Sequence, residues 1–327
     1  MRSFVRSFQR RSRPGIAEVK NRPGLGVALA LAAAVLWGTT GTAQHLAPAR
    51  ISPYWIGALR LVIATLFFGA WLALAERRTA ASRAARASPA SRVDPGPVLL
   101  RTLLAGACMA AYNLAFFAGV RVAGVAIGTT VAIGSAPLLA GALQAVFTRR
   151  MPGGLWWLGT ALAIGGGALV ALVDAHALRV DGLGIVLCMV AGLAYASYTL
   201  LAKSVAEHAT PLRTNFRVFA SAALLALPAA WALAPGGVGA LATAGPAGWG
   251  VVVYLGVVAT GVAYLLFSHA LRGISAATGV ALAQAEPLTA FTLAVLVLGE
   301  PLGVGGVVGI AAMMAGLALV VQGERRG

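Results

Sequence analysis

The sequence is poor in charged residues, and this scarcity decides the class of protein. Asp, Glu, Lys and Arg make up 10% of the 327 residues, and only 9 residues are acidic. Soluble domains carry roughly 25% charged residues on average. A chain that is 59% hydrophobic cannot cover a water-facing surface with so few charges. The composition excludes a soluble globular protein and indicates a protein embedded in the lipid bilayer.

Sequence patterns of disulfide, metal-binding and nucleotide-binding proteins are also missing. The two cysteines, Cys108 and Cys188, fall inside apolar runs, so we expect small buried side chains rather than a disulfide framework. The four histidines show no His-x-x-x-His spacing, and the chain has neither a Gly-x-Gly-x-x-Gly nor a Walker pattern. We therefore expect no metal site, no catalytic residues and no cofactor. The net charge of +16 lies on no folded polar domain, so we expect no nucleic-acid partner.

Long apolar runs make up most of the chain. A helix needs about 20 apolar residues to cross the hydrocarbon layer, and strict alternation of apolar and polar residues is absent. The sequence therefore predicts an all-α integral membrane protein with ten transmembrane helices. We expect the first to be retained rather than cleaved as a signal peptide. The predicted spans are 24–47, 53–75, 98–119, 124–147, 155–173, 182–202, 212–233, 248–271, 276–298 and 304–321.

The basic residues predict the orientation. Alternation through ten spans places the Arg-rich segment 76–97, Arg149-Arg150 and the Arg325-Arg326 tail on one side, with Lys203 and Arg272. The positive-inside rule makes this side cytoplasmic. We expect a multi-pass protein of the bacterial inner membrane with both termini inside. Residues 1–23 form a basic cytoplasmic segment, 76–97 a mobile cytoplasmic linker and 322–327 a cytoplasmic tail.

The second half of the chain repeats the first at an offset of roughly 150 to 158 residues. Pro53 is followed seven residues later by Arg60, and Pro211 is followed six residues later by Arg217. An Arg inside an apolar span is costly, so its recurrence argues for a duplication. The predicted repeats are 24–173 and 182–321. Five spans per repeat is an odd number, so the repeats are inverted, as in many secondary transporters.

The chain also resembles a known family. Its motifs are residues 36–38 (LWG), the Pro-x6-Arg pattern of the second span, the junction 270–277, Glu286-Pro287 and residues 298–302 (LGEPL). Together they resemble the ten-helix EamA branch of the drug/metabolite transporter (DMT) superfamily. Members often have Gly-Glu after the fourth helix, where this chain has Arg149-Arg150. The resemblance implies export of small metabolites, most frequently amino acids, and extends to exporters of aromatic amino acids.

Polar and aromatic side chains within the spans are candidates for lining a substrate cavity, because polar groups at membrane depth face a bundle interior or water. On the first helix they follow one face at spacings of three, four and seven residues. Packing and helix-to-helix hydrogen bonding are the alternative roles. The predicted substrate-binding residues are Trp37, Thr40, Gln44, His45, Tyr112, Asn113, Tyr195, Tyr198, Tyr264 and Gln284.

Glu286 is the one acidic residue clearly inside a predicted span. A carboxyl group in a low-dielectric site is a candidate for proton coupling or for binding a substrate ammonium; a structural pairing with Arg217 is the alternative. The next residue, Pro287, and Pro137 of the first repeat predict matched helix breaks with a role in gating. For Arg60 and Arg217 we favour a structural role over carboxylate binding.

The fifth and tenth spans are rich in glycine and predict close packing. The offset of 150 superimposes Gly159 on Gly309 and Gly166 on Gly316. We expect a monomer or a homodimer. The leading hypothesis is a secondary transporter that exports amino acids with aromatic or other apolar side chains by alternating access, its partners being a small-molecule substrate and the lipid bilayer. The alternatives are a drug or cation efflux transporter and a polytopic membrane enzyme acting on lipid.

Overall fold

The computed structural model describes residues 23–46, 51–83, 95–172, 181–206, 209–299 and 303–326, and over these residues the chain is helical without strands. This confirms the predicted all-α class. The elements are α2 (Pro23–Leu46), α3 (Pro53–Arg83), α4 (Pro95–Ala123), α5 (Val125–Thr148), α6 (Gly154–Leu172), α7 (Gly182–Ala206), α8 (Pro211–Leu233), η1 (Gly237–Thr243), α9 (Gly245–Gly256), η2 (Val257–Val262), α10 (Ala263–Ala270), α11 (Ala276–Leu282), α12 (Ala285–Leu298) and α13 (Val304–Arg326).

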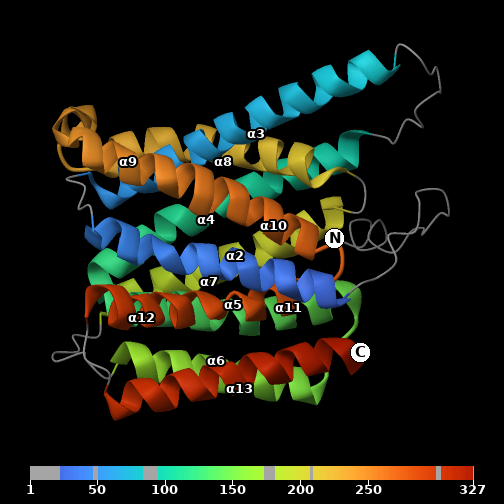
Figure 1. Ribbon diagram of the computed structural model, residues 1–327, viewed down its shortest axis with the longest axis vertical. Coiled ribbons are helices and arrows are strands. Elements are labelled where there is room, and N and C mark those ends of the chain that lie inside the picture. Colours follow the sequence, from blue (N-terminus) through green and yellow to red (C-terminus); the bar gives the residue numbers. More distant parts are fainter. Residues whose placement is uncertain are drawn as a thin grey trace.

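Ten stretches of the described residues are long and apolar enough to cross a membrane, as predicted. Eight are single helices, and two are composite: α9, the π-helix η2 and α10 form the eighth span, while α11 and α12 form the ninth. The spans lie side by side along one direction in Figure 1, and the start of α2 and the end of α13 lie at the same end of the bundle. Prolines at the first position of α2, α3, α4 and α8 suit these helix starts, because proline fixes a helical φ where no hydrogen bond is lost.

The predicted bounds of the linker, 76–97, are wrong at both edges, where the structure has helix. Helix α3 continues to Arg83, and α4 already begins at Pro95. Ala and Arg are among the strongest helix formers, and they dominate the stretch after Arg77, which explains why the helix extends beyond the apolar run. Residues 84–94, for which we predicted mobility, lie outside the described residues. Residues 1–22, the greater part of the predicted N-terminal segment, also lie outside them.

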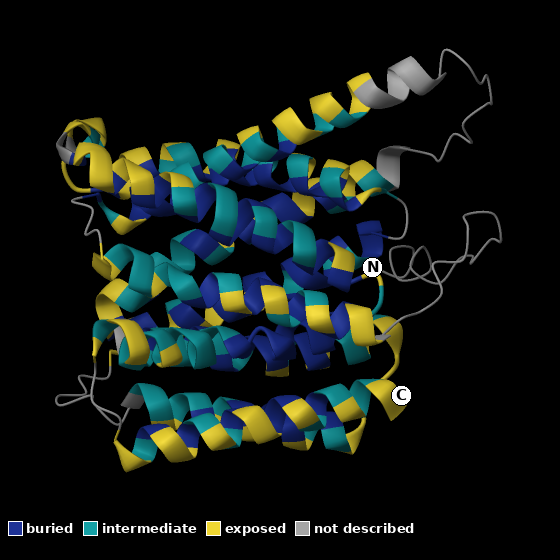
Figure 2. Cartoon of the chain, in the orientation of Figure 1, coloured by how far each residue is buried: buried dark blue, intermediate teal, exposed yellow. Residues whose placement is uncertain are grey.

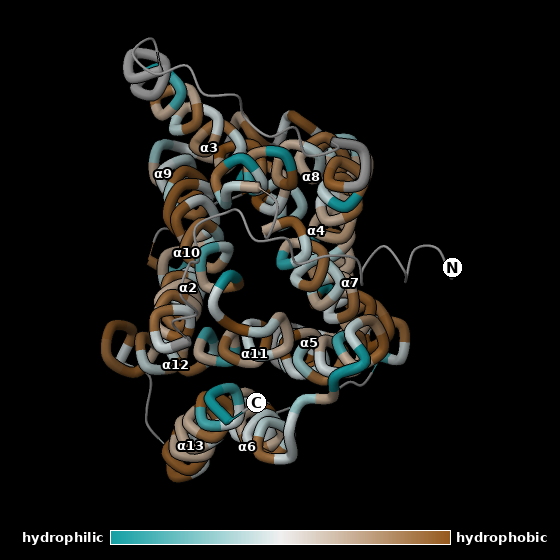
Figure 3. Tube along the Cα trace, turned by 90° about the vertical axis from the view of Figure 1, so that its right-hand side faces the viewer, coloured by the Kyte–Doolittle hydropathy of each residue, from teal (hydrophilic) through white to brown (hydrophobic). Residues whose placement is uncertain are grey.

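Helices α6 and α13 pack against each other through glycine and lie outside the ring formed by the other spans (Figure 3). A Cβ atom on Gly159 would stand 2.6 Å from the Gly316 carbonyl oxygen, and one on Gly166 would stand 2.5 Å from that of Gly309. Each repeat contributes the same pair of positions, related by the offset of 150. The glycine faces of α6 and α13 therefore pack against each other within the chain.

The outer surface of the bundle is apolar. Figure 2 shows buried residues along the inner faces of the helices, and Figure 3 shows hydrophobic residues around the outside. Leu66, Leu224 and Leu296 are exposed by 66%, 74% and 76%. Such a surface is stable in contact with lipid tails and not with water. The exposed leucines lie on spans from both repeats.

The predicted break at Pro137 is wrong, because α5 runs unbroken from Val125 to Thr148. Proline cannot donate a hydrogen bond to the carbonyl four residues earlier, here that of Ile133. The Gln284 side chain replaces the missing donor, with Nε2 2.6 Å from the Ile133 oxygen. Pro287 lies in the first turn of α12, where proline is tolerated. The ninth span is interrupted just before it, at Ala283 and Gln284.

Candidate functional site

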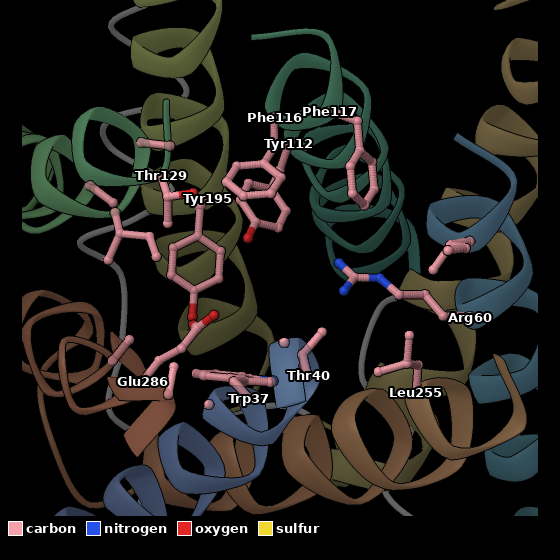
Figure 4. Close-up of a pocket in the computed structure, with 18 of the residues that line it drawn as sticks. Trp37, Thr40, Arg60, Tyr112, Phe116, Phe117, Thr129, Tyr195, Leu255 and Glu286 are labelled. Atoms are coloured by element: carbon pink, nitrogen blue, oxygen red, sulfur yellow. The ribbon is translucent and has the colours of Figure 1, made fainter. Parts of the chain in front are cut away.

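A cavity of about 280 Å³ lies between the two repeats, and Figure 4 shows its lining side chains. The first repeat contributes residues of α2, α3, α4 and α5, and the second contributes residues of α7, α9, α10, α11 and α12. The lining residues are Trp37, Gly38, Thr40, Gly41, Gln44, Ile56, Arg60, Tyr112, Phe116, Phe117, Thr129, Ala132, Ile133, Ala136, Tyr195, Leu255, Tyr264, Val280, Ala283, Glu286 and Ala290.

Among the described residues, the lining of the cavity extends toward one end of the bundle. Its lining uses the last turns of α2, up to Gln44, and the first turns of α3, so it reaches the end where α2 stops and α3 begins; we call this the open end. Toward the opposite end, which we call the closed end, Trp37 packs on Phe267 with ring centroids 5.3 Å apart. Tyr195 and Tyr264 also contact Trp37, and all four rings are buried. These rings form the floor of the cavity.

The chain at the closed end is held by polar side chains from two other helices. The turn between α10 and α11 covers residues 271–275. Lys203 of α7 donates to the main-chain oxygens of Leu271 and Ile274, both at 2.8 Å. Glu324 of α13 accepts from the Ser275 amide at 2.7 Å and from the hydroxyls of Ser275 and Thr278. The turn is therefore held by α7 and α13, the first and the last helix of the second repeat. The packed rings of the floor lie above it.

Arg60 reaches into the cavity from α3. One of its terminal nitrogens, Nη2, donates to Asn113 Oδ1 on α4 at 2.7 Å, and the Asn113 amide in turn donates to the Met109 oxygen at 2.9 Å. Asn113 is 2% exposed, so its carbonyl is fixed behind the guanidinium. Figure 4 shows the guanidinium pointing into the space below Tyr112 and Phe117. The same contact thus joins α3 to α4 and orients a positive charge.

Glu286 lies on the other side of the cavity, beside Trp37 and Tyr195 (Figure 4). It stands in the first turn of α12, next to the interruption of the ninth span. Gly38 brings α2 and α12 together here, because a Cβ atom at this position would stand 2.6 Å from the Glu286 carbonyl oxygen. The close approach places the Trp37 ring and the Glu286 carboxyl group on the same wall.

Three polar atoms of the lining residues are buried and have no hydrogen-bond partner in the described structure. They are Trp37 Nε1, Arg60 Nε and the Tyr195 hydroxyl. Buried polar groups are hydrogen-bonded in the large majority of cases, so each unpaired one calls for an explanation. All three belong to residues of one cavity, which indicates a place where a polar ligand or water completes the hydrogen bonding.

Most of the predicted substrate-binding residues line this cavity: Trp37, Thr40, Gln44, Tyr112, Tyr195 and Tyr264, together with Glu286. The others do not. His45 is exposed at the end of α2, and Asn113 stands behind Arg60. Tyr198 is buried beneath Tyr195 and Tyr264, with centroids 6.1 and 5.9 Å away. The Gln284 side chain donates its hydrogen bond to the Ile133 carbonyl oxygen.

The two arginines that follow a proline by seven and six residues, Arg60 and Arg217, have different surroundings. Arg60 lines the cavity, whereas Arg217 is exposed on α8 and does not reach Glu286. From the sequence we favoured a structural role for Arg60 and did not single out Phe116, Phe117 or Leu255, although all four line the cavity. The four-residue spacing from Tyr112 to Phe116 was an available signal, because residues four apart share a helix face.

The eighth span contains a π-helix, Val257–Val262, between the lining residues Leu255 and Tyr264. Extra backbone residues of this kind occur frequently at functional sites. Gly256 and Gly261 let this segment press on α3, because Cβ atoms there would stand 2.5 Å from Ile63 and 2.7 Å from Phe67. The π-helix sets the register at which Tyr264 enters the cavity floor.

Comparison with known proteins gives the family. Residues 24–172 and 182–322 each match the EamA-like transporter family. The chain belongs to the EamA-like transporter family. This confirms the resemblance to the drug/metabolite transporter superfamily and establishes a multi-pass membrane transporter. Family membership implies transport rather than catalysis.

Relatives of this EamA-like transporter cover much of its length. It is 37% identical to the uncharacterized transporter YwfM of Bacillus subtilis (strain 168) over 298 residues, which are 90% of this chain and 93% of that protein. It is 30% identical to a probable terminal-alkyne amino-acid exporter of Streptantibioticus cattleyicolor, over 56% of this chain and 61% of that one. A crystal structure with 19% identity superimposes with a TM-score of 0.70, covering 92% of this chain and 98% of the other, and supports the shared fold.

Proposed function

We propose that this transporter exports amino acids with aromatic or other apolar side chains across the bacterial inner membrane by alternating access. The observation that carries the proposal is the cavity between the repeats, which opens at one end, is sealed by packed rings at the other, and combines aromatic walls with Arg60 and Glu286. A cavity at the interface of inverted repeats is where secondary transporters bind substrate.

The lining supports an amphipathic cargo. Tyr112, Phe116 and Phe117 offer ring surfaces on which an apolar side chain can stack. The relative from Streptantibioticus is named as an amino-acid exporter, which favours the same class of substrate here. The volume of about 280 Å³ is near the lower end of small-molecule sites, roughly 300 to 1,000 Å³, and suits a single amino acid better than a peptide.

The distribution of basic residues supports an orientation of the bundle in the membrane. Arg149, Lys203, Arg272 and Arg326 lie near the end of the bundle that holds Pro23, which we propose faces the cytoplasm under the positive-inside rule. The open end then faces outward, and the structure corresponds to the state from which exported substrate leaves. The return to a state open to the cytoplasm requires the closed end to separate.

A drug or cation efflux transporter is the second candidate, and the aromatic rings with Glu286 favour it, since cations bind to ring faces beside a carboxylate. Arg60 on the same cavity disfavours a cation without an anionic group. The two candidates therefore differ in whether a carboxylate on the substrate helps or hinders binding.

The test is counterflow into proteoliposomes. Purified protein is reconstituted, the vesicles are loaded with an unlabelled solute, and uptake of the labelled solute is followed for Phe, Trp, Met and Thr and for a panel of quaternary ammonium drugs. We expect uptake of at least one apolar amino acid well above that of protein-free liposomes. Flux equal to protein-free liposomes for every amino acid, with flux of the drugs, would replace the proposal by the second candidate.

A further inference from the structure

Arg60 and Glu286 carry opposite charges, face the same cavity and belong to different repeats. Both line this cavity, yet no ion pair between them is found in the described part of the chain, where Arg213 and Glu76 form a salt bridge on the surface. Opposite charges attract strongly in a low-dielectric site, and a ligand that carries both charges can bridge two groups that do not pair directly. The space between them is the cavity.

Each charged group has unused hydrogen-bonding capacity directed at this space. A guanidinium has five N–H donors, of which Asn113 takes one, while Nε is buried without a partner. A carboxylate oxygen pair would satisfy it through two parallel hydrogen bonds. On the opposite wall, the Glu286 carboxyl group can accept hydrogen bonds from a ligand. The unpaired Tyr195 hydroxyl and Trp37 N–H belong to its neighbours in the cavity.

The rings complete the selection of a ligand. Trp37 and Tyr195 stand beside Glu286, where their faces favour a cation. Tyr112 and Phe117 stand above the Arg60 guanidinium in Figure 4 and offer apolar surface beside it. The cavity therefore presents an anion site, a cation site and an apolar wall at once.

We infer that Arg60 and Glu286 bind the two charged groups of a zwitterionic α-amino acid. Arg60 binds the carboxylate and Glu286 binds the ammonium group. The apolar side chain of the amino acid lies against Tyr112, Phe116 and Phe117. This inference rests on the proposed function and narrows it to substrates that carry both charges. A ligand that lacks either charge leaves one half-buried charged group of the cavity without a partner, so binding of that ligand is weak.

The experiment compares three solutes that share a side chain. L-phenylalanine carries both charges, phenethylamine lacks the carboxylate, and 3-phenylpropanoate lacks the ammonium group. Each competes against labelled phenylalanine, both in counterflow and in equilibrium binding to the purified protein. For the wild type we expect each analogue to compete at least about tenfold more weakly than phenylalanine, the ratio for about 1.4 kcal/mol.

The variants assign each charge to its residue. Arg60→Gln should remove the advantage of phenylalanine over phenethylamine and keep that over 3-phenylpropanoate. Glu286→Gln should remove the advantage of phenylalanine over 3-phenylpropanoate and keep that over phenethylamine. Arg60→Lys keeps the charge without the planar fork and should retain part of the selectivity, which tests the idea even where the Gln variant folds poorly. The matched controls are Arg217→Gln, at the equivalent exposed position, and Glu76→Gln on the surface, and both should behave as the wild type.

The outcomes separate this inference from the proposed function. If phenylalanine binds with the expected selectivity and is not moved, transport is wrong and the inference stands. If amino acids are moved and both analogues compete as well as phenylalanine, the inference is overturned and transport stands. If Glu286→Gln abolishes the response of flux to a proton gradient and leaves the selectivity unchanged, the carboxyl group serves proton coupling, and the inference is overturned.

Discussion

Asn113 sets the position of the charge on Arg60. It holds the guanidinium at 2.7 Å and is itself fixed by the Met109 carbonyl. A hydrogen bond between membrane helices contributes ~0.6 to 1.7 kcal/mol, so we expect Asn113→Ala to raise the KM for a transported amino acid by about three- to twentyfold. The charge remains available in this variant, so turnover at saturating substrate should change little.

Asn113→Asp distinguishes electrostatics from positioning. The aspartate has the same shape and places a negative charge against Arg60, where it would compete with the carboxylate of the proposed amino-acid substrate. We expect a larger rise in KM than for Asn113→Ala, measured in the same counterflow assay with folding checked by gel filtration. A variant with Asp that performs as well as the wild type would mean that Asn113 only joins α3 to α4.

The two arginines show what single residues reveal before a structure is known. The repeated spacing from Pro53 to Arg60 and from Pro211 to Arg217 was sufficient to recognise a duplication. It was not sufficient to assign their roles, because the same motif is rotated toward the cavity in one repeat and toward the outside in the other. Helix rotation depends on what each helix packs against, and this information is spread over distant residues.

At the scale of elements, Gly38 controls the contact between α2 and α12. A methyl group there would stand 2.5 Å from Thr289 Cβ and 2.6 Å from the Glu286 carbonyl oxygen. Overpacking costs ~1 to 3 kcal/mol. We expect Gly38→Ala to lower the free energy of unfolding by about this amount and to reduce transport, because α12 must move away together with Glu286.

Thermal unfolding of the purified protein followed by intrinsic fluorescence measures the loss of stability. Gly24→Ala is the control, since it lies on the same helix and a Cβ atom there would meet nothing within 4 Å. Equal melting temperatures for the Gly38 and Gly24 variants would show that α2 and α12 separate without cost.

The helices themselves were predictable, and their irregularities were not. Runs of about 20 apolar residues located all ten spans because lipid demands that length. Pro137 indicated a break that does not occur, since Gln284 compensates the freed carbonyl from another span. The π-helix at 257–262 left no comparable signal, because it depends on how Gly256 and Gly261 meet α3.

At the scale of the whole molecule, the closed end is held by hydrogen bonds that the proposed alternating access must break. Lys203 and Glu324 hold the turn 271–275 from α7 and α13. We expect Lys203→Met and Glu324→Gln to raise the population of molecules that open at this end, by about fivefold for each ~1 kcal/mol removed.

A cysteine reports this opening. Ala202 is buried and lies one helical turn beyond Tyr198 toward the closed end. In a background without Cys108 and Cys188, Ala202→Cys should react faster with a membrane-impermeant thiol reagent when Lys203 or Glu324 is replaced. Glu76→Gln is the charge-matched control for Glu324→Gln. An unchanged rate in both test variants would mean that the packed rings, and not these polar ties, keep the end shut.

The overall architecture followed from the sequence, but its asymmetry did not. The odd number of spans per repeat predicted inverted halves, which would be related by symmetry if both ends were alike. In the structure one end is open and the other is closed, so equivalent residues such as Trp37 and Tyr195 meet in one floor rather than lining two matched sites. A sequence specifies both conformations of a transporter and does not say which one is observed.

The hydrogen bond between Gln284 and the Ile133 carbonyl has a consequence for how such chains evolve. Proline at position 137 is tolerated inside α5 because an amide from the other repeat replaces the donor that proline removes. The amide at 284 is in turn useful because proline has left an acceptor free. The two positions therefore constitute one inherited unit: a lineage that replaces the proline by a residue with an N–H releases position 284 from its amide, whereas loss of the amide first leaves an unpaired carbonyl inside the membrane. Substitutions at these sites should accumulate in that order.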